Sequence, residues 1–133
     1  MRSEVELSAL TEIIIGCAID VHRELGPGLM ESVYETCLKQ LLREEGLEVT
    51  SQIRQPIYFR GNKLDKEFIL DLMVEDEIIL ELKSVEKLLP VHEAQLVTYL
   101  KLANKQIGLL INFNSVLLKD GIRRKINSKP EHI

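Results

Sequence analysis

The sequence predicts a single α/β domain, and three observations indicate this fold class. Two stretches before Gly46 repeat apolar residues with the 3.6-residue period of a helix. The segment Phe68–Val85 holds two runs rich in Ile, Leu and Val that indicate a pair of buried strands. A third helical pattern and another apolar run follow. A chain of 133 residues can build one such core but not two. We therefore expect a mixed sheet of about four to six strands flanked by helices.

The composition is that of a folded protein with an acidic balance. Hydrophobic residues make up 45% and charged residues 29%, which excludes a disordered chain. The net charge of −4 argues mildly against a protein that coats nucleic acid without selectivity. The end of the chain differs, since Lys119 to Lys129 carries five cations against Asp120 alone. This basic stretch is either a solvated tail or a contact for nucleic acid.

Cysteine usage and the first residues indicate a cytoplasmic protein. Cys17 and Cys37 lack metal-site spacing and fall inside predicted helices, so we expect small core residues in a reducing compartment. The opening MRSEVELSAL has no apolar secretory core. No apolar run approaches the roughly 18 residues that a membrane helix needs.

The first helix is predicted from about Ser8 to Leu25, where Gly26-Pro27 ends it. His22 lies in its apolar stripe, as either a hydrogen-bonded core residue or a metal ligand or base. The second helix is predicted from Glu31 to Glu45.

Within the second helix, Glu31 and Tyr34 share a face with Leu38 because they are spaced i, i+3 and i+7. The helix should bury this face. Glu31 is therefore either a favourable charge at the helix N-terminus or part of a site.

An extended segment is predicted from Leu47 to Phe59, with Pro56 at a bulge or a sheet edge. Gly61-Asn62 favours a hairpin turn. A loop from Asp65 to Glu67 should lead into the central strands. Its two carboxylates are solvated charges, or substitutes for Asp71 if that residue faces away.

Three charged residues lie inside the two apolar runs of the central segment: Asp71, Glu81 and Lys83. Buried charges are costly unless they are paired, so this placement needs a reason. Alternation puts Glu81 and Lys83 on one face. A three-residue loop, Glu75–Glu77, would pair Val74 with Ile78 and set Asp71 opposite Glu81, whereas a two-residue loop would place these carboxylates on opposite faces. With the longer loop, two carboxylates and an ammonium group converge, and such a set can hold a divalent cation for metal-assisted hydrolysis.

A third helix is predicted from Pro90 to about Asn104, followed by a buried strand, Gln106–Phe113. An edge strand or hairpin with the basic residues should follow from Val116 to Ile126. Residues 1–7 and 127–133 are expected to be frayed.

The third helix places His92, Gln95 and Tyr99 on one face, at i, i+3 and i+7. From the pattern alone, Gln95 and Tyr99 are boundary residues of an amphipathic helix.

Three signatures resemble those of a known superfamily. Asp71 followed by Glu81-Leu82-Lys83 resembles the D…(D/E)xK signature of the restriction-endonuclease-like, or PD-(D/E)xK, nucleases. Gln95 to Tyr99 is similar to the QxxxY helix of their RecB-type members. Gly28 to Tyr34 matches the signature of the GxxExxY family, which is assigned to that superfamily. The resemblance runs from about Leu10 to about Arg124.

The resemblance implies a restriction-endonuclease-like fold and a metal-dependent nuclease. Asp71, Glu81 and the Leu82 carbonyl would hold Mg²⁺ or Mn²⁺, Glu31 would complete the site, and Lys83 would orient or deprotonate the attacking water. Gln95 would orient the lysine, a water or a phosphate. The residues expected to contact nucleic acid, DNA more than RNA, are Tyr34, Tyr99, Arg123, Arg124 and Lys125. His22 and His92 are further candidates for the site.

Two other interpretations remain open. One is a catalytically inactive module that uses the same fold to hold nucleic acid or a protein. The other is a buried ion network without chemistry. A homodimer is also expected, because pairing hides sheet edges.

Overall fold

The computed structural model describes residues 2–128 of the chain. Met1 and residues 129–133, which were expected to be frayed, lie outside the described residues. The helices are α1 (Glu4–Leu25), α2 (Glu31–Glu44), α3 (Pro90–Ala103) and the short 3₁₀ helix η1 (Leu118–Gly121). The strands are β1 (Val49–Phe59), β2 (Asn62–Val74), β3 (Ile78–Lys83), β4 (Ile107–Asn112) and β5 (Ile122–Ile126).

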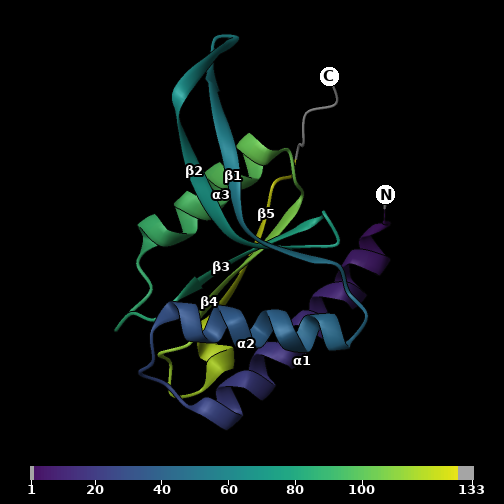
Figure 1. Ribbon diagram of the computed structural model, residues 1–133, viewed down its shortest axis with the longest axis vertical. Helices are drawn as coiled ribbons and strands as arrows, with labels where there is room; N and C mark the ends of the chain where they lie inside the picture. Colours follow the sequence, from purple (N-terminus) through teal and green to yellow (C-terminus); the bar gives the residue numbers. More distant parts are fainter. Residues whose placement is uncertain (1, 129–133) are drawn as a thin grey trace.

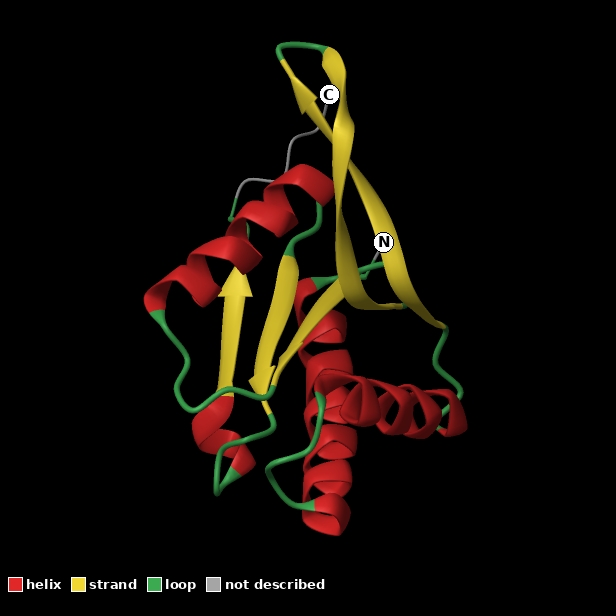
Figure 2. Cartoon of the chain, turned by 60° about the vertical axis from the view of Figure 1, so that its left-hand side comes forward, coloured by secondary structure: helices red, strands yellow, loops and turns green. Residues whose placement is uncertain are grey.

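The five strands form one mixed sheet in the order β1-β2-β3-β4-β5. The β3–β4 pair is parallel and the other pairs are antiparallel. The α3 crossover between β3 and β4 supplies the long connection that a parallel pair requires. Helices α1 and α2 cover one face of the sheet and α3 covers the other (Figures 1 and 2). This is the α/β architecture that the sequence predicts.

Each face of the sheet has its own core. The first core lies between the sheet and the pair α1 and α2, and includes Ile14, Tyr34, Leu80 and Ile111. The second core lies under α3 and consists of Leu70, Met73, Ile79, Leu96, Leu100 and Leu110. Strands β3 and β4 are buried on both sides, which explains their continuous apolar runs. None of the helices within residues 2–128 is long and apolar enough to cross a membrane.

The chain start is more ordered than predicted. Helix α1 begins at Glu4, where the Ser3 hydroxyl accepts from the Glu6 N–H and the Glu6 carboxylate accepts from the Ser3 N–H. The expectation of fraying over residues 1–7 is therefore wrong from Ser3 onward. The predicted frayed end also begins too early, because Asn127 is buried and its N–H donates to the Gln106 carbonyl at 2.8 Å.

The acidic loop between β2 and β3 has the three-residue length that the parity argument required. Val74 pairs with Ile78, and the Glu77 N–H donates to the Val74 carbonyl at 3.0 Å. Glu75 and Asp76 have φ values of +54° and +57°, as in the turns that favour tight hairpins. Arg2 contacts Glu75 at 2.6 Å and thereby neutralises part of the turn's charge.

The β1–β2 hairpin extends beyond the rest of the sheet. Strand β3 pairs only with the end of β2, Leu72–Val74. The segment Pro56–Glu67 therefore projects as a two-stranded ribbon, visible at the top of Figure 1, and we name it the arm. The expected loop from Asp65 to Glu67 is wrong, because these residues belong to β2. The expected irregularity at Pro56 is confirmed, since the register shifts between Pro56 and Tyr58.

The β1–β2 hairpin turns over at Gln52, so that residues of the same parity pack in different cores before and after it. In β1, Val49 packs in the first core and Ile53 against the second, although alternation alone would give them one face. In β2, Leu72 belongs to the first core and Leu70 to the second. Between them Gln52 has a left-handed φ of +52°, and the register sets it opposite Asp71. Asp71 therefore lies where the hairpin passes from one side of the sheet to the other.

Candidate active site

Asp71 and Glu81 face each other across β2 and β3. Regular pairing of the two strands ends at Leu72 and Leu80, one residue before Asp71 and Glu81. The Leu82 N–H donates to Asp71 Oδ2 at 2.8 Å, and the Asp71 N–H donates to Glu81 Oε1 at 3.3 Å. Glu81 is 6% exposed and Asp71 is half-buried. The structure thus brings together the two carboxylates that the parity argument placed on one face.

The surroundings favour the protonated form of this pair. Burial, and then the charge of Asp71, raise the pKa of Glu81 to about 8, against the opposing effects of the Asp71 N–H and Lys83. Burial is also the main cause that raises the pKa of Asp71, while the Leu82 N–H lowers it and the charge of Glu31 raises it further. Two carboxylates so close in a dry place cannot both ionise freely, so they share protons or need a cation.

Lys83 is the last residue of β3 and lies on the same face as Glu81 by alternation. Its positive charge lowers the pKa of both Asp71 and Glu81, so its field reaches the pair. The Lys83 carbonyl accepts from the Phe113 N–H at 2.8 Å, which fixes the backbone at the end of the strand. The predicted ammonium group therefore shares the face of Glu81, and its charge acts on both carboxylates.

Glu31 stands next to this pair without joining it. It is the exposed first residue of α2, and its Oε2 accepts from the Ser84 N–H at 3.3 Å. Within residues 2–128, no group of three Asp, Glu, His or Cys side chains has the geometry of a metal site. That Glu31 completes the site stays a prediction: its carboxylate contacts the backbone of the residue that follows Lys83, and its charge raises the pKa of Asp71. A hollow beside it is lined by Gly28, Leu29, Met30, Glu31, Ser32, Ser84 and Asn114.

Glu35 and Gln52 border the site and were not predicted. The Gln52 amide donates to Glu35 Oε1 at 2.8 Å. Burial raises the pKa of Glu35, the Gln52 bond lowers it, and the charge of Asp71 raises it again. The sequence held one signal, because Glu31 and Glu35 are spaced i, i+4 and share a side of α2.

Helix α3 contributes Tyr99 to the edge of the pair. Its ring stacks on Phe68 of β2, with centroids 4.1 Å apart. Burial raises the pKa of Tyr99, and the charges of Glu81 and Asp71 raise it further. Gln95 is exposed, one turn earlier on the same helix face. His92 instead caps the helix, since its Nδ1 accepts from the Leu89 N–H at 3.0 Å.

Tyr34 has a structural place rather than the predicted contact with nucleic acid. Its side chain is 0% exposed and stacks on Phe113, with ring centroids 4.4 Å apart. Its hydroxyl donates to the Gly26 carbonyl at 2.6 Å and accepts from the Leu29 N–H at 3.0 Å. The predicted surface role is therefore corrected: Tyr34 holds the α1–α2 connection that places Glu31.

His22 is also committed to a backbone contact, because its Nε2 lies 2.7 Å from the Ser115 carbonyl oxygen. This is the hydrogen-bonded alternative that the sequence left open.

The predicted basic residues lie on β5, at the sheet edge opposite β1. Arg124 is exposed. Arg123 donates to the Asp120 and Ile122 carbonyls, and Lys125 pairs with Glu93 of α3 at 2.9 Å. Part of this positive charge is therefore used within the protein.

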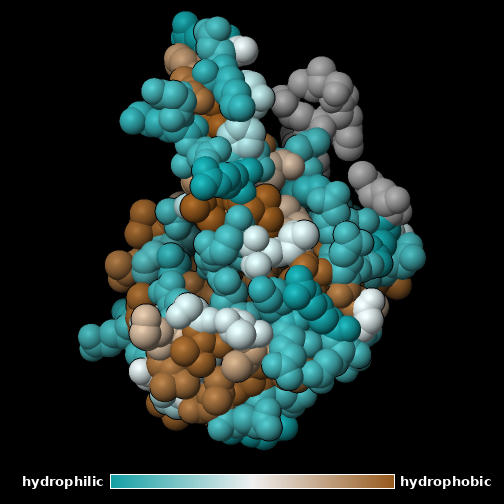
Figure 3. Space-filling model, viewed as in Figure 1, coloured by the Kyte–Doolittle hydropathy of each residue, from teal (hydrophilic) through white to brown (hydrophobic). Residues whose placement is uncertain are grey.

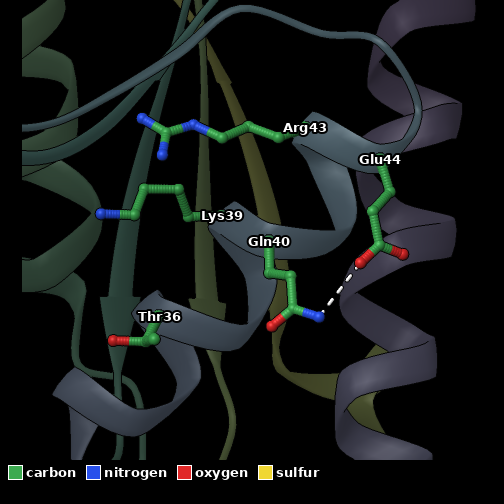
Figure 4. Close-up of a pocket in the computed structure, with 5 residues that line it drawn as sticks. All are labelled: Thr36, Lys39, Gln40, Arg43 and Glu44. Atoms are coloured by element: carbon green, nitrogen blue, oxygen red, sulfur yellow. Dashed lines mark hydrogen bonds between the residues drawn. The ribbon is translucent and has the colours of Figure 1, made fainter.

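A second hollow lies on the outer side of α2 and carries no such chemistry. Figure 4 shows that Lys39 and Arg43 extend one way from the helix, while Gln40 donates to Glu44 on the other side. Lys39 reaches the Ser51 hydroxyl at 3.2 Å and Arg43 the Val49 carbonyl at 2.9 Å, so both cations bind α2 to β1.

The donor set at the Asp71–Glu81 pair fits a hard divalent cation. Carboxylate oxygens are the ligands that Mg²⁺ prefers, and the Leu82 carbonyl is a third oxygen in the same strand. A buried pair of mutually repelling carboxylates is also the arrangement that a cation would relieve.

Comparison with known proteins gives one result. The family model described as the PD-(D/E)XK nuclease superfamily matches residues 8–125. No curated protein and no solved structure matches the chain.

Proposed function

Because the chain belongs to the PD-(D/E)XK nuclease superfamily, we propose that it is a metal-dependent nuclease that hydrolyses phosphodiester bonds. The observation that carries this proposal is the Asp71–Glu81 pair, with Lys83 on the same face. Nucleases of this superfamily generally use divalent metals such as Mg²⁺. The motif from Gly28 to Tyr34 supports a finer assignment to the GxxExxY family.

The proposed roles follow from where each residue lies. Asp71, Glu81 and the Leu82 carbonyl hold Mg²⁺ or Mn²⁺. A bound cation would lower the pKa of a coordinated water and neutralise charge on the phosphate. Lys83 orients the attacking water or removes its proton.

The remaining roles are outside the pair. Glu31 supports the site through the backbone after Lys83, because its carboxylate holds the Ser84 N–H. Tyr99 contacts the strand being cut and Gln95 orients a water or a phosphate. Arg124 offers an exposed cation to the nucleic acid, for which we propose DNA.

The test is a cleavage assay on single-stranded and duplex DNA and RNA with Mg²⁺, Mn²⁺ or EDTA. We expect cleavage only with metal, and its loss in Lys83→Met and Glu81→Gln. Glu12→Gln removes an exposed carboxylate on α1 and serves as the charge-matched control. Binding of nucleic acid without cleavage under every metal condition would instead favour an inactive binding module.

A further inference from the structure

The arm, Pro56–Glu67, has no core of its own. Every residue from Tyr58 to Glu67 is exposed. An isolated two-stranded hairpin is marginally stable in water, so a projecting one needs either a partner or a strong reason to remain extended. In Figure 3 the arm, at the top of the view, shows mainly hydrophilic surface with apolar surface between.

The arm is rich in aromatic side chains in a chain that has few. The sequence contains three Tyr, three Phe and no Trp. Tyr34 and Phe113 stack in the first core. The other four lie on the arm or at its base: Tyr58, Phe59, Phe68 and Tyr99. Tyr58 is 56% exposed and Phe59 is 62% exposed at the tip. Exposed aromatic rings offer large flat apolar surfaces, and aromatic residues are enriched where proteins bind partners.

The charge of the tip is opposite to that of the whole chain. From Tyr58 to Lys66 there are three cations, Arg60, Lys63 and Lys66, against Asp65, while the chain has a net charge of −4. The Arg60 guanidinium lies over the Phe59 ring, 5.4 Å from its centroid. The tip therefore joins flat apolar surface to positive charge, which complements the bases and phosphates of a nucleic acid.

Two aromatic residues connect the base of the arm to the candidate active site. Gln55 lies on the α3 side of β1, because its amide donates to the Leu102 carbonyl at 3.2 Å. Phe59 lies four residues further out along β1, beyond the register shift between Pro56 and Tyr58. Phe68, which pairs with Gln55, stacks on Tyr99 at the edge of the carboxylate pair. The stacked rings of Phe68 and Tyr99 thus lie at the base of the arm, and Phe59 lies at its tip.

We propose that the arm binds single-stranded nucleic acid and leads it to the Asp71–Glu81 pair. An unpaired base stacks on Phe59 while Arg60 contacts a phosphate, and Tyr58 with its cross-strand partner Lys63 offers the same two contacts on the other face of the ribbon. Single strands are the fitting substrate because their bases are free to stack, whereas duplex bases are already stacked on one another. This inference depends on the proposed function only for the class of substrate.

The test measures binding separately from cleavage. A labelled single-stranded oligonucleotide of about 16 nucleotides, and its duplex, are titrated in EDTA with the full chain. The variants are Phe59→Ala, Tyr58→Ala, Arg60→Ala and the conservative Phe59→Tyr. Val5→Ala and Arg23→Ala are the matched controls, because both positions are exposed on α1, away from the arm.

We expect the wild type to prefer the single strand over the duplex. Phe59→Ala should weaken single-strand binding about 5- to 150-fold, the loss typical of one base–aromatic stack. Phe59→Tyr should retain binding, and the two control variants should leave it unchanged. Arg60→Ala should reduce the slope of log affinity against log salt by about 1.

Three outcomes overturn the inference: no binding by the wild type, binding that is indifferent to all arm variants, or a Phe59→Ala variant that changes only the mass in solution. The last result would assign the arm to a second copy of the chain. Failure of the proposed function gives a different result. Binding that depends on the arm, without any metal-dependent cleavage, would contradict the nuclease proposal and still support the role of the arm.

Discussion

Asp71 and Glu81 each accept a backbone hydrogen bond from the opposite strand, Asp71 from Leu82 and Glu81 from Asp71 itself. Regular pairing of β2 with β3 ends one residue earlier, at Leu72 and Leu80. The two carboxylates therefore replace carbonyl groups as acceptors where the strands begin to separate. Asn and Gln keep an oxygen acceptor at these positions, so amide variants remove the charge and retain the acceptors.

The stability of the metal-free protein should decrease with rising pH. The pKa of Glu81 is raised from 4.5 to about 8, so the folded state keeps its proton where the unfolded chain has lost it. This contribution to stability is fully present below pH 4.5 and is lost as the pH rises to about 8. Within that range the unfolding free energy should fall by at most roughly 1.4 kcal/mol per pH unit. Glu81→Gln should flatten this slope. Urea unfolding in EDTA, repeated at several pH values between 4.5 and 8, measures the slope. Glu12→Gln, at an exposed position of α1, should keep the wild-type slope, and equal slopes in both variants would contradict the prediction.

Divalent metal should stabilise the protein through the same pair. At a hundredfold excess over the dissociation constant, binding to the folded state adds about 2.7 kcal/mol to the unfolding free energy. Asp71→Asn and Glu81→Gln should lose this response and should be at least as stable as the wild type in EDTA, because each removes one member of a repelling pair. Lys83→Met should be less stable in EDTA but should still respond to metal. Melting curves with EDTA, Mg²⁺ and Mn²⁺ decide this. A wild type that does not respond would indicate a structural ion network.

Gln52 should tolerate glycine better than valine, contrary to ordinary strand preference. Its φ of +52° costs a residue with a Cβ roughly 1–2 kcal/mol, and a β-branched residue suffers most. Gln52→Gly relieves that cost and loses the bond to Glu35, whereas Gln52→Val loses the bond and keeps the cost. Thr50 is exposed in the same strand and is the control, since Thr50→Val should be more stable than Thr50→Gly. Chemical denaturation of the four variants gives the order, and the same order at both positions would contradict the left-handed conformation.

Two glycines should respond to alanine in opposite directions. A Cβ at Gly121 would contact the Ser115 hydroxyl oxygen and would lie 2.7 Å from the Asn112 carbonyl oxygen. Gly121→Ala should therefore destabilise by about 1–3 kcal/mol, as overpacked sites do. Gly16 lies inside α1 with open space around it, so Gly16→Ala should stabilise by up to about 1 kcal/mol. Thermal melting compares them, and a neutral Gly121→Ala would show that the η1 turn can move.

The sequence predicted the central strands and their register because the pattern there is strong. Two long apolar runs fix β2 and β3, and the parity of a three-residue turn then fixes which carboxylates meet. The segment from Asp65 to Glu67 was misassigned for a physical reason: both faces of the arm meet solvent, so no period of two marks it as a strand. The ordered start of α1 did have a signal, the Ser3 and Glu6 capping pair.

The site residues that the sequence missed depend on tertiary structure. Glu35 meets Gln52 only because the hairpin turns over at a left-handed residue, and no local pattern predicts that turn. Tyr34 was expected to contact nucleic acid because of the resemblance to a functional motif, although its spacing with Leu38 indicated a buried face. Its burial and its two bonds to the α1–α2 connection show how a motif residue can be structural.

The acidic turn has a consequence for the tolerance of the chain to insertions and deletions. Surface loops usually accept changes of length at little thermodynamic cost. At Glu75–Glu77, losing or gaining one residue would reverse the alternation of β2 against β3, and would move Asp71 to the α1–α2 side while Glu81 stayed under α3. Changes by two residues preserve that relation. The number of residues in this surface loop must therefore stay odd if Asp71 and Glu81 are to share a face of the sheet.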